Sequence, residues 1–326
     1  MGQQLTMSET GWKLGDMAAT REAYGKALKE LGDKNPNVVV LDADLSGSTQ
    51  TKHFAKAHPD RFFNMGIAEM NMIGTAAGLA RMGKIPFASS FAMFAAGRAW
   101  EFVRNSVAHN HLNVKVCATH AGLTVGEDGA SHQIIEDVAI MRVIPTMTVI
   151  VPADAIEAYQ AIYAIAEYDG PVYARLGRAK VPVVFDENYR FEIGKAATLV
   201  EGGDVSLIAC GVMVYRAIEA AKELEKQGIR AEVINMATIK PLDNAAIIKT
   251  ASKTGRVITL EEHNVIGGLG DAVASVLAEE HNSNVIFKRM GIEDKFGQSG
   301  DGMALLDHYG LAVSDIVAEA TRQCKA

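Results

Sequence analysis

The sequence predicts an α/β protein of two domains, each built on a mainly parallel sheet that is flanked by helices. The chain has 326 residues, which is enough for two domains of ordinary size. Short apolar runs, typical of strands, alternate along the chain with amphipathic segments, typical of helices. The runs are apolar at consecutive positions, which indicates parallel strands that are covered on both faces.

The composition excludes several classes of protein. Hydrophobic residues make up 48% and charged residues 22%, a balance that excludes a disordered chain. The formal net charge is −7, and no basic block of the kind that binds nucleic acid is present in the sequence. The most apolar segment is interrupted by Arg81 and Lys84, so we expect no membrane span. The three cysteines are too far apart in sequence for a disulfide framework, which favours a cytoplasmic location.

The first half of the chain alternates between the two kinds of element. Its first helix is expected to have Thr20 as N-cap and to end at Gly32. The apolar runs that follow predict strands at 38–41, 114–119, 147–151 and 172–174. Helical patterns follow at 66–83, 133–142 and 153–168.

The second half repeats this alternation after a break. Strands are expected at 204–209, 230–236, 256–261 and 285–289, and helices at 213–227, 243–253, 268–281 and 313–324. Residues 177–196 are extended and of mixed charge, and they interrupt the rhythm. We therefore place a domain boundary there and expect domains of residues 1–185 and 186–326.

One carboxylate lies in an unusually apolar segment. The helix expected at 66–83 is apolar nearly all round and should be buried, and Glu69 is its only acid. A buried carboxylate is costly unless another group pairs with it. Glu69 either satisfies N–H groups in the first helical turn or belongs to an active site, and this segment alone leaves both interpretations open.

Two phenylalanines lie soon after this helix. Phe91 and Phe94 are three residues apart, so on a helix they would share a face. Such a pair is more often part of a core than the wall of a cofactor site, and it gains interest only beside Glu69.

The loop at 120–133 is rich in groups that form hydrogen bonds. It follows a predicted strand, so His120 lies at the carboxyl end of that strand, and Asp128 and His132 come later in the loop. Its glycines are Gly122, Gly126 and Gly129. The spacing matches no zinc-binding helix, and an ordinary surface loop is the alternative. Loops at the carboxyl ends of parallel strands are where open α/β sheets bind ligands.

The same rule brings other side chains to that edge of the sheet. Asp44 and Ser48 follow the strand at 38–41, and Arg175 follows the strand at 172–174. If the sheet is parallel, these side chains and His120 project toward one edge. Arginine and histidine beside a hydroxyl suit a phosphate or a polyhydroxylated ligand.

A glycine-rich turn at 261–272 is the last candidate. The glycines at 267, 268 and 270 do not fit the dinucleotide-binding fingerprint, so tight packing at the start of a helix is the favoured interpretation. His263 in this turn is a candidate ligand contact only.

Taken together, these motifs closely resemble those of transketolases. The shared motifs are MGIAE, F-x-x-F, DADLSGST, ATHAGLTVGEDGASHQ and LEEH-x-x-x-GGLGDAV. The resemblance covers essentially the whole chain and corresponds to the pyrimidine-binding and C-terminal domains, the last two-thirds of a usual transketolase. In that family a separate N-terminal domain holds the diphosphate of thiamine diphosphate and its Mg2+, through a GDG motif followed by asparagine. The GDG at 300–302 has no asparagine after it, so we interpret it as a coincidence.

The resemblance therefore implies the smaller chain of a split transketolase, completed by a partner subunit that carries the N-terminal domain. Glu69 would hydrogen-bond N1′ of the cofactor's aminopyrimidine, and Phe94, with Phe91 behind it, would stack on that ring. The remaining cofactor contacts implied in this chain are Asp44, Leu45 and Ile67. The partner would hold the diphosphate and the Mg2+, and two copies of each subunit are expected.

The resemblance also implies how a sugar phosphate would bind. The implied binding residues are Arg21, Ser48, His120 and Arg175. Asp128 would contact a donor hydroxyl, and His132 would assist proton transfer as the carbon–carbon bond breaks. The implied reaction moves a two-carbon ketol unit from a ketose phosphate to an aldose phosphate, as in the pentose phosphate pathway.

The sequence departs from the family pattern at three places and leaves two alternatives open. Gly97 stands where a third aromatic residue is common, Ala121 replaces an acid, and Met70-Asn71 follows Glu69. One alternative is another thiamine enzyme, either a beta subunit of a 2-oxo acid dehydrogenase or a deoxyxylulose phosphate synthase fragment. The other is a non-catalytic α/β binding subunit that keeps the fold without turnover.

Overall fold

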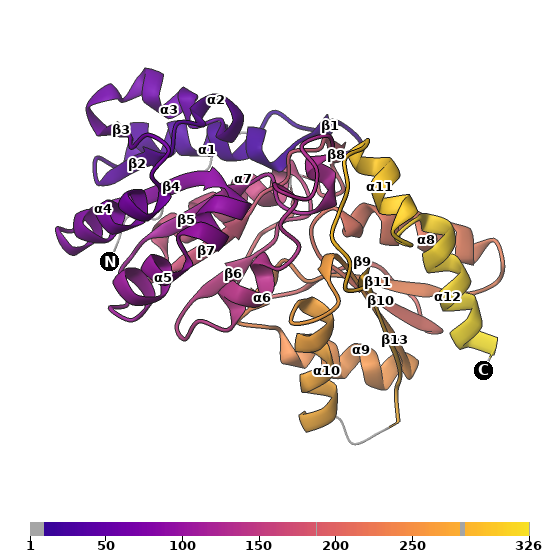
Figure 1. The fold of residues 1–326 in the computed structure, drawn as a ribbon. Helices are drawn as coiled ribbons and strands as arrows, with labels where there is room; N and C mark the ends of the chain where they lie inside the picture. Colours follow the sequence, from indigo (N-terminus) through magenta and orange to yellow (C-terminus); the bar gives the residue numbers. More distant parts are fainter. Residues whose placement is uncertain (1–9, 187, 281–283, 326) are drawn as a thin grey trace.

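The computed structural model describes residues 10–186, 188–280 and 284–325. The first half of the chain, indigo to magenta in Figure 1, and the second half, orange to yellow, each form a sheet with helices against it. A short antiparallel ribbon of β1 (Met17–Ala18) and β8 (Val181–Pro182) joins the two ends of the first half. The predicted α/β class with two mainly parallel sheets is confirmed.

The first sheet has seven strands in the order β12-β6-β7-β5-β4-β2-β3. They are β2 (Val38–Asp42), β3 (Phe62–Asn64), β4 (Ile85–Phe91), β5 (Lys115–Thr119), β6 (Thr148–Ile150), β7 (Val172–Arg175) and β12 (Thr238–Lys240). All neighbours are parallel except β12, which comes from the second half of the chain and pairs antiparallel with β6. The two halves therefore share one sheet edge.

Alternate residues of these strands belong to two different cores, which explains their continuously apolar sequences. Val38 and Val40 pack in the core beneath α1 (Thr20–Lys34), whereas Val39 and Leu41 pack in the core beneath α4 (Glu69–Arg81). The other helices of this half are α2 (Ser46–Thr49), α3 (Lys52–Ala57), η1 (Pro59–Arg61), η2 (Met93–Arg98), α5 (Trp100–Phe102), η3 (Val103–Ala108), η4 (Leu123–Val125), α6 (Asp137–Arg142) and α7 (Ala155–Glu167). Burial on both faces is what a parallel sheet between helices requires.

The second sheet has five strands in the order β14-β13-β10-β11-β9. They are β9 (Ala197–Val200), β10 (Val205–Ala209), β11 (Ala231–Asn235), β13 (Arg256–Asn264) and β14 (Ile286–Ile292), of which only β9 is antiparallel to its neighbour. Its helices are α8 (Met213–Glu225), α9 (Asn244–Thr254), α10 (Leu269–Glu280), α11 (Gly302–His308) and α12 (Val313–Lys325). The helix expected at 268–281 is α10, and residue 281 lies outside the described residues.

Four local expectations were wrong. Thr20 is the first residue of α1 and Ala19 is its N-cap. Gly32 does not end α1; a Cβ there would lie 2.5 Å from the His58 ring, so the glycine allows close approach. The helix expected at 133–142 begins only at Asp137, because residues 129–133 form turns of the preceding loop. Helix α4 is not buried all round.

Strand β4 is a further difference. Ser89 and Ser90 interrupt its apolar run, which hides the strand in the sequence. The Ser89 hydroxyl is 2.6 Å from the Tyr24 hydroxyl, so this polar atom is satisfied in the core. Among the described residues, no helix is long and apolar enough to cross a membrane.

Candidate active site

Glu69 is the first residue of α4, and its carboxylate is almost fully buried. The side chain is 2% exposed, and Oε2 accepts a hydrogen bond from Nη1 of Arg98 at 2.8 Å. The Arg98 side chain itself is 46% exposed and lies over the Phe94 ring, with Cζ 4.6 Å from the centroid. The sequence analysis missed Arg98, although a basic residue four positions after Phe94 in an apolar segment was a usable signal.

An aromatic wall continues from Phe94. The rings of Phe91 and Phe94 are stacked at a centroid distance of 6.3 Å. The spacing suggested that these two residues share one helix, but they do not. Phe91 ends β4, and Phe94 belongs to the π-helix η2. The His132 ring meets Phe94 edge-on at 5.4 Å, and the His120 ring stacks on Phe91 at 3.9 Å.

His120 follows β5 and takes a left-handed backbone conformation with φ of 59°, which is uncommon for a residue other than glycine. Its Nε2 lies 3.4 Å from Nη1 of Arg21, and its Nδ1 lies 2.8 Å from Oγ1 of Thr119. Because a guanidinium only donates, Nε2 is an acceptor and Nδ1 carries the proton. Burial, the guanidinium charges of Arg21 and Arg178, and His132 lower the pKa of His120 to about 3. His120 is therefore a neutral imidazole.

Arg21 connects this wall to the loop after β2. Its Nη1 donates to the carbonyl of Ser48 at 2.9 Å. Its Nε is buried and has no hydrogen-bond partner among the described residues. An orphaned donor beside a neutral imidazole is what an anionic ligand would satisfy.

Asp128 lies at the exposed tip of the loop at 120–133, together with Glu127. Nη1 of Arg178 is 3.2 Å from Oε2 of Glu127 and 3.8 Å from Oδ2 of Asp128, and it also donates to the carbonyl of Val125. The sequence analysis missed Arg178 because it lies in the segment interpreted as a domain boundary. Its position three residues past the end of β7 was the signal that could have found it.

Arg175 lies apart from this cluster. Its side chain is 7% exposed, and its Nε donates to Oδ2 of Asp137 at 2.8 Å. Its Nη1 is 3.6 Å from Oε2 of Glu262, and its Nη2 donates to the Glu262 carbonyl at 2.9 Å. A guanidinium that is buried between two carboxylates has little to offer a phosphate.

The other candidates lie at the edge of the cluster or outside it. Asp44 is exposed and accepts a hydrogen bond from Asn64, Leu45 is half-buried, and Ile67 is 78% exposed. His263 is buried: Nε2 accepts from the Ala139 amide and Nδ1 donates to the Asn264 carbonyl, so the interpretation as a ligand contact is wrong. In the GDG sequence, Asp301 accepts hydrogen bonds from two amides at the start of α11 and acts as its N-cap.

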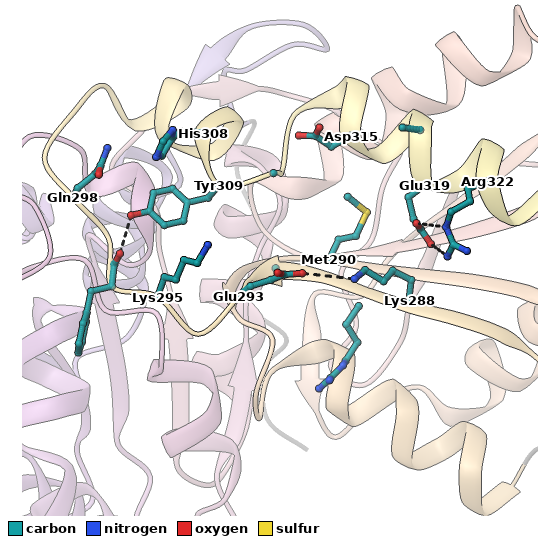
Figure 2. A pocket seen from close by; sticks show the side chains of 15 residues that line it. Lys288, Met290, Glu293, Lys295, Gln298, His308, Tyr309, Asp315, Glu319 and Arg322 are labelled. Carbon is teal, nitrogen blue, oxygen red and sulfur yellow. Dashed lines mark hydrogen bonds and ion pairs between the residues drawn. The ribbon is translucent and has the colours of Figure 1, made fainter.

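A large cavity lies elsewhere, in the second half of the chain. It has a volume of about 720 Å³ and lies between β14 and the helices α11 and α12. Figure 2 shows Lys295, Gln298 and His308 at one end of it and the Glu319–Arg322 ion pair at the other. None of the candidate residues lines this cavity.

The arrangement as a whole suits a polar aromatic ring and an anion side by side. Contacts run without interruption from Glu69 through Arg98, Phe94 and Phe91 to His120, and then to Arg21. A buried carboxylate beside an aromatic wall fits an aminopyrimidine, which offers hydrogen-bonding edges and a flat face. The described residues include no group of three acidic, histidine or cysteine side chains that could hold a metal ion. The residues present therefore fit the pyrimidine of thiamine diphosphate.

Comparison with known proteins identifies the two halves. Residues 16–183 match the pyrimidine-binding domain of transketolase, and residues 194–316 match the transketolase C-terminal domain. A protein of Methanocaldococcus jannaschii named as a transketolase C-terminal section is 54% identical over 94% of this chain and 96% of its own length. A 6-deoxy-6-sulfo-D-fructose transketolase subunit of a Clostridium species is 46% identical over 92% of each chain.

A solved structure agrees with this assignment of the two halves. A split-gene transketolase, solved as an inactive β4 tetramer, has a TM-score of 0.88 and 56% identity, and the match covers 94% of this chain and 98% of that one. The resemblance predicted from the motifs is thus confirmed, except that the chain matches about half the length of full-size transketolases and not two-thirds. The chain belongs to the transketolase family, as its pyrimidine-binding and C-terminal domains.

Proposed function

We propose that this chain is the C-terminal subunit of a split transketolase and transfers a two-carbon ketol unit from a ketose phosphate to an aldose phosphate. It works with thiamine diphosphate, and a partner subunit carrying the diphosphate-binding domain holds the diphosphate and the Mg2+. The proposed assembly has two copies of each subunit and acts in the cytoplasm, within pentose phosphate metabolism.

One observation carries this proposal: a buried carboxylate lies beside exposed apolar side chains. Glu69 is shielded from water, but two residues before it Ile67 is exposed, and Met70 directly after it is exposed as well. Soluble proteins rarely leave large apolar side chains exposed around a polar site unless a partner covers them. The buried carboxylate with exposed apolar neighbours therefore supports a site that a second chain completes.

The residues of this chain then have defined tasks. When bound, thiamine diphosphate supplies the carbanion chemistry that breaks the carbon–carbon bond. Glu69 holds a hydrogen bond to the pyrimidine in a pocket with little water, where that bond is strong. Phe91 and Phe94 hold the flat face of the ring, and Asp44, Leu45 and Ile67 line the rest of the cofactor pocket.

The polar residues bind the sugar phosphate. Arg21 and Ser48 bind the phosphate with Arg178, which replaces Arg175 in this role because Arg175 is buried between its two carboxylates, whereas Arg178, paired with exposed carboxylates, is partly exposed. His120 is a neutral imidazole, so it hydrogen-bonds the sugar and does not form an ion pair with the phosphate. Asp128 contacts a donor hydroxyl, and His132 moves the proton as the bond breaks.

The relatives support the division between two chains. The M. jannaschii protein and the split-gene transketolase match this chain over nearly their whole length, and the latter is inactive as a β4 tetramer. The Clostridium relative acts on a sulfonated sugar, so the acidic group of the substrate can vary within the family. A phosphorylated substrate is proposed here because two arginines and a neutral imidazole face one region.

The test is a reconstitution. Thiamine diphosphate and Mg2+ are titrated into this chain alone and into this chain with its candidate partner, and ketol transfer from xylulose 5-phosphate is followed. Activity is expected only with both chains present. If the complex decarboxylates pyruvate and leaves xylulose 5-phosphate untouched, it is a 2-oxo acid enzyme. Full activity of the isolated chain would also contradict the proposal.

A further inference from the structure

The loop at 120–133 rests on a carboxylate from the other half of the chain. Glu262 belongs to β13 of the C-terminal domain, and its side chain is 4% exposed. Its Oε1 accepts a hydrogen bond from the backbone amide of Thr124 at 2.5 Å. Thr124 lies in η4, the short helical turn within the loop that separates His120 from His132. Glu262 contributes no atom to the proposed site, but it holds the loop at 120–133, which carries several of the site residues.

The contact between loop and carboxylate is very close. Gly122 has φ of 78°, and a Cβ at this position would lie 2.3 Å from Cδ of Glu262. Glycine is therefore required here by both the backbone conformation and the proximity of the carboxylate. The first turn of the loop therefore lies directly against the Glu262 carboxylate.

The position of Glu262 is itself fixed. Arg175 donates to its backbone carbonyl and lies 3.6 Å from its carboxylate, while the same guanidinium bonds Asp137. Burial raises the pKa of Glu262, and the positive charge of Arg175 opposes that rise. Two carboxylates thus share one guanidinium at the boundary between the domains.

A second contact from the C-terminal domain holds the far end of the loop. Nε2 of Gln133 donates to the carbonyl of Gln298 at 3.0 Å as well as to the carbonyl of Gly126. Gly302, at the start of α11, approaches Thr124 so closely that a Cβ would lie 2.9 Å from the Thr124 Cα. The loop is therefore clamped between β13 and the segment before α11.

We propose that Glu262 is a positioning residue for ketol transfer: through the Thr124 amide and Gly122 it holds the loop so that His120, Asp128 and His132 face the sugar. In this view the C-terminal domain acts on the reaction by fixing the geometry of the pyrimidine-binding domain. The kinetic part of this inference rests on the function proposed above, whereas its structural part concerns this chain alone.

Three variants separate positioning from general stability. Glu262→Ala removes the acceptor for the Thr124 amide, whereas Glu262→Gln keeps an acceptor oxygen and leaves Arg175 paired with Asp137. The control is Glu232→Ala, because Glu232 is an equally buried carboxylate of the same domain whose hydrogen bonds, among the described residues, go to Ser206, Thr250 and Lys253 and not to the loop. Hydrogen exchange of the amides at 122–133 is measured on the full chain, and sugar KM and kcat are measured on the complex with its partner.

For Glu262→Ala we expect exchange at 122–133 to accelerate about tenfold or more, the scale of a lost charge-assisted hydrogen bond. The sugar KM of the complex should rise by a similar factor at saturating cofactor. Glu232→Ala should lower the melting temperature without either change, and Glu262→Gln should restore most of the protection. Equal exchange at 122–133 in Glu262→Ala and Glu232→Ala would overturn the proposal. If the wild-type complex transfers no ketol unit, the proposed function fails, but the exchange result still decides whether Glu262 holds the loop.

Discussion

Two arginine–carboxylate pairs in this chain have the same length and opposite surroundings. Arg98 and Glu69 are 2.8 Å apart, and so are Arg175 and Asp137. Arg98 is nearly half exposed over a buried partner, whereas Arg175 and Asp137 are both buried. The distance alone does not distinguish them. Access to water does, because it decides whether one partner can leave when another group arrives.

This difference assigns different roles to the two pairs, which we call the open pair (Arg98 and Glu69) and the closed pair (Arg175 and Asp137). Arg98 can swing into solvent at little cost, which would free Glu69 for a ligand. Arg175 has no such option, because removing a charge from a buried pair leaves the other charge uncompensated. The first pair therefore suits a binding site that opens and fills, and the second suits a permanent junction between domains.

The largest effect is expected at the carboxylate of the open pair. Glu69→Gln should reduce ketol transfer by the reconstituted complex roughly 100- to 10,000-fold, the usual contribution of a positioned acid or base. The amide keeps the size of the side chain, so urea unfolding of the isolated chain should change little. Activity within a factor of about three of wild type would remove Glu69 from the mechanism and favour a non-catalytic binding subunit.

A change in the closed pair should lower the stability of the folded chain. Arg175→Met leaves Asp137 and Glu262 buried without their cation, so the free energy of unfolding should fall by about 3–5 kcal/mol. The measurement is urea denaturation of the chain at neutral pH. Glu262→Gln is the matched comparison, since it removes one of two carboxylates around a single guanidinium and should cost much less. Equal losses in the two variants would show that the charge balance at the junction is not what stabilises it.

His120 combines features of both pairs: it belongs to the candidate site, as Glu69 does, and it is buried, as Arg175 is. Its pKa is about 3 when folded and about 6.5 when unfolded, so the unfolded chain binds the extra proton first. Stability from this group is complete above pH 6.5 and is lost as pH falls toward 3. Between pH 7 and pH 5 the loss should be about 2 kcal/mol.

The measurement is the difference between wild type and His120→Gln in unfolding free energy at several pH values. A difference is needed because Glu157, whose pKa is raised to about 7 by burial, contributes with the opposite sign over the same range. A pH slope unchanged by His120→Gln would contradict the neutral imidazole.

Much of the fold could be predicted from the sequence because buried parallel strands have a strong local signal. The runs at 38–41 and 114–119 coincide with β2 and β5 to within one residue. Strand β4 could not be predicted in this way, because Ser89 and Ser90 are buried polar residues, and the partner of Ser89, Tyr24, is far away in the chain. The role of Gly32 was predicted wrongly for the same reason, since its neighbour His58 directly follows another helix, α3.

The candidate site shows the same division. Glu69, Phe91, Phe94, His120 and His132 could be selected from their residue types and positions, whereas Arg21 was implied only by the family resemblance, and the structure brings all six together. Arg175 and Arg178 could not be ranked, because one ends β7 and the other follows it closely, and only the folded chain shows that Arg175 is buried between its carboxylates while Arg178 is partly exposed. Glu262 could not be placed near the loop at all, since 138 residues separate it from Thr124.

The smallest effect is expected from the cation of the open pair. Arg98→Met should lower the free energy of unfolding by about 1 kcal/mol, less than Arg175→Met does, because Arg98 is nearly half exposed and only one buried carboxylate, Glu69, loses its cation. The methionine keeps an apolar side chain over Phe94, so the aromatic wall stays covered. Urea unfolding of Arg98→Met beside Arg175→Met measures the contrast directly. A loss as large as that of Arg175→Met would show that Arg98 is held as firmly as Arg175. A ligand could then not displace Arg98 from the Glu69 carboxylate.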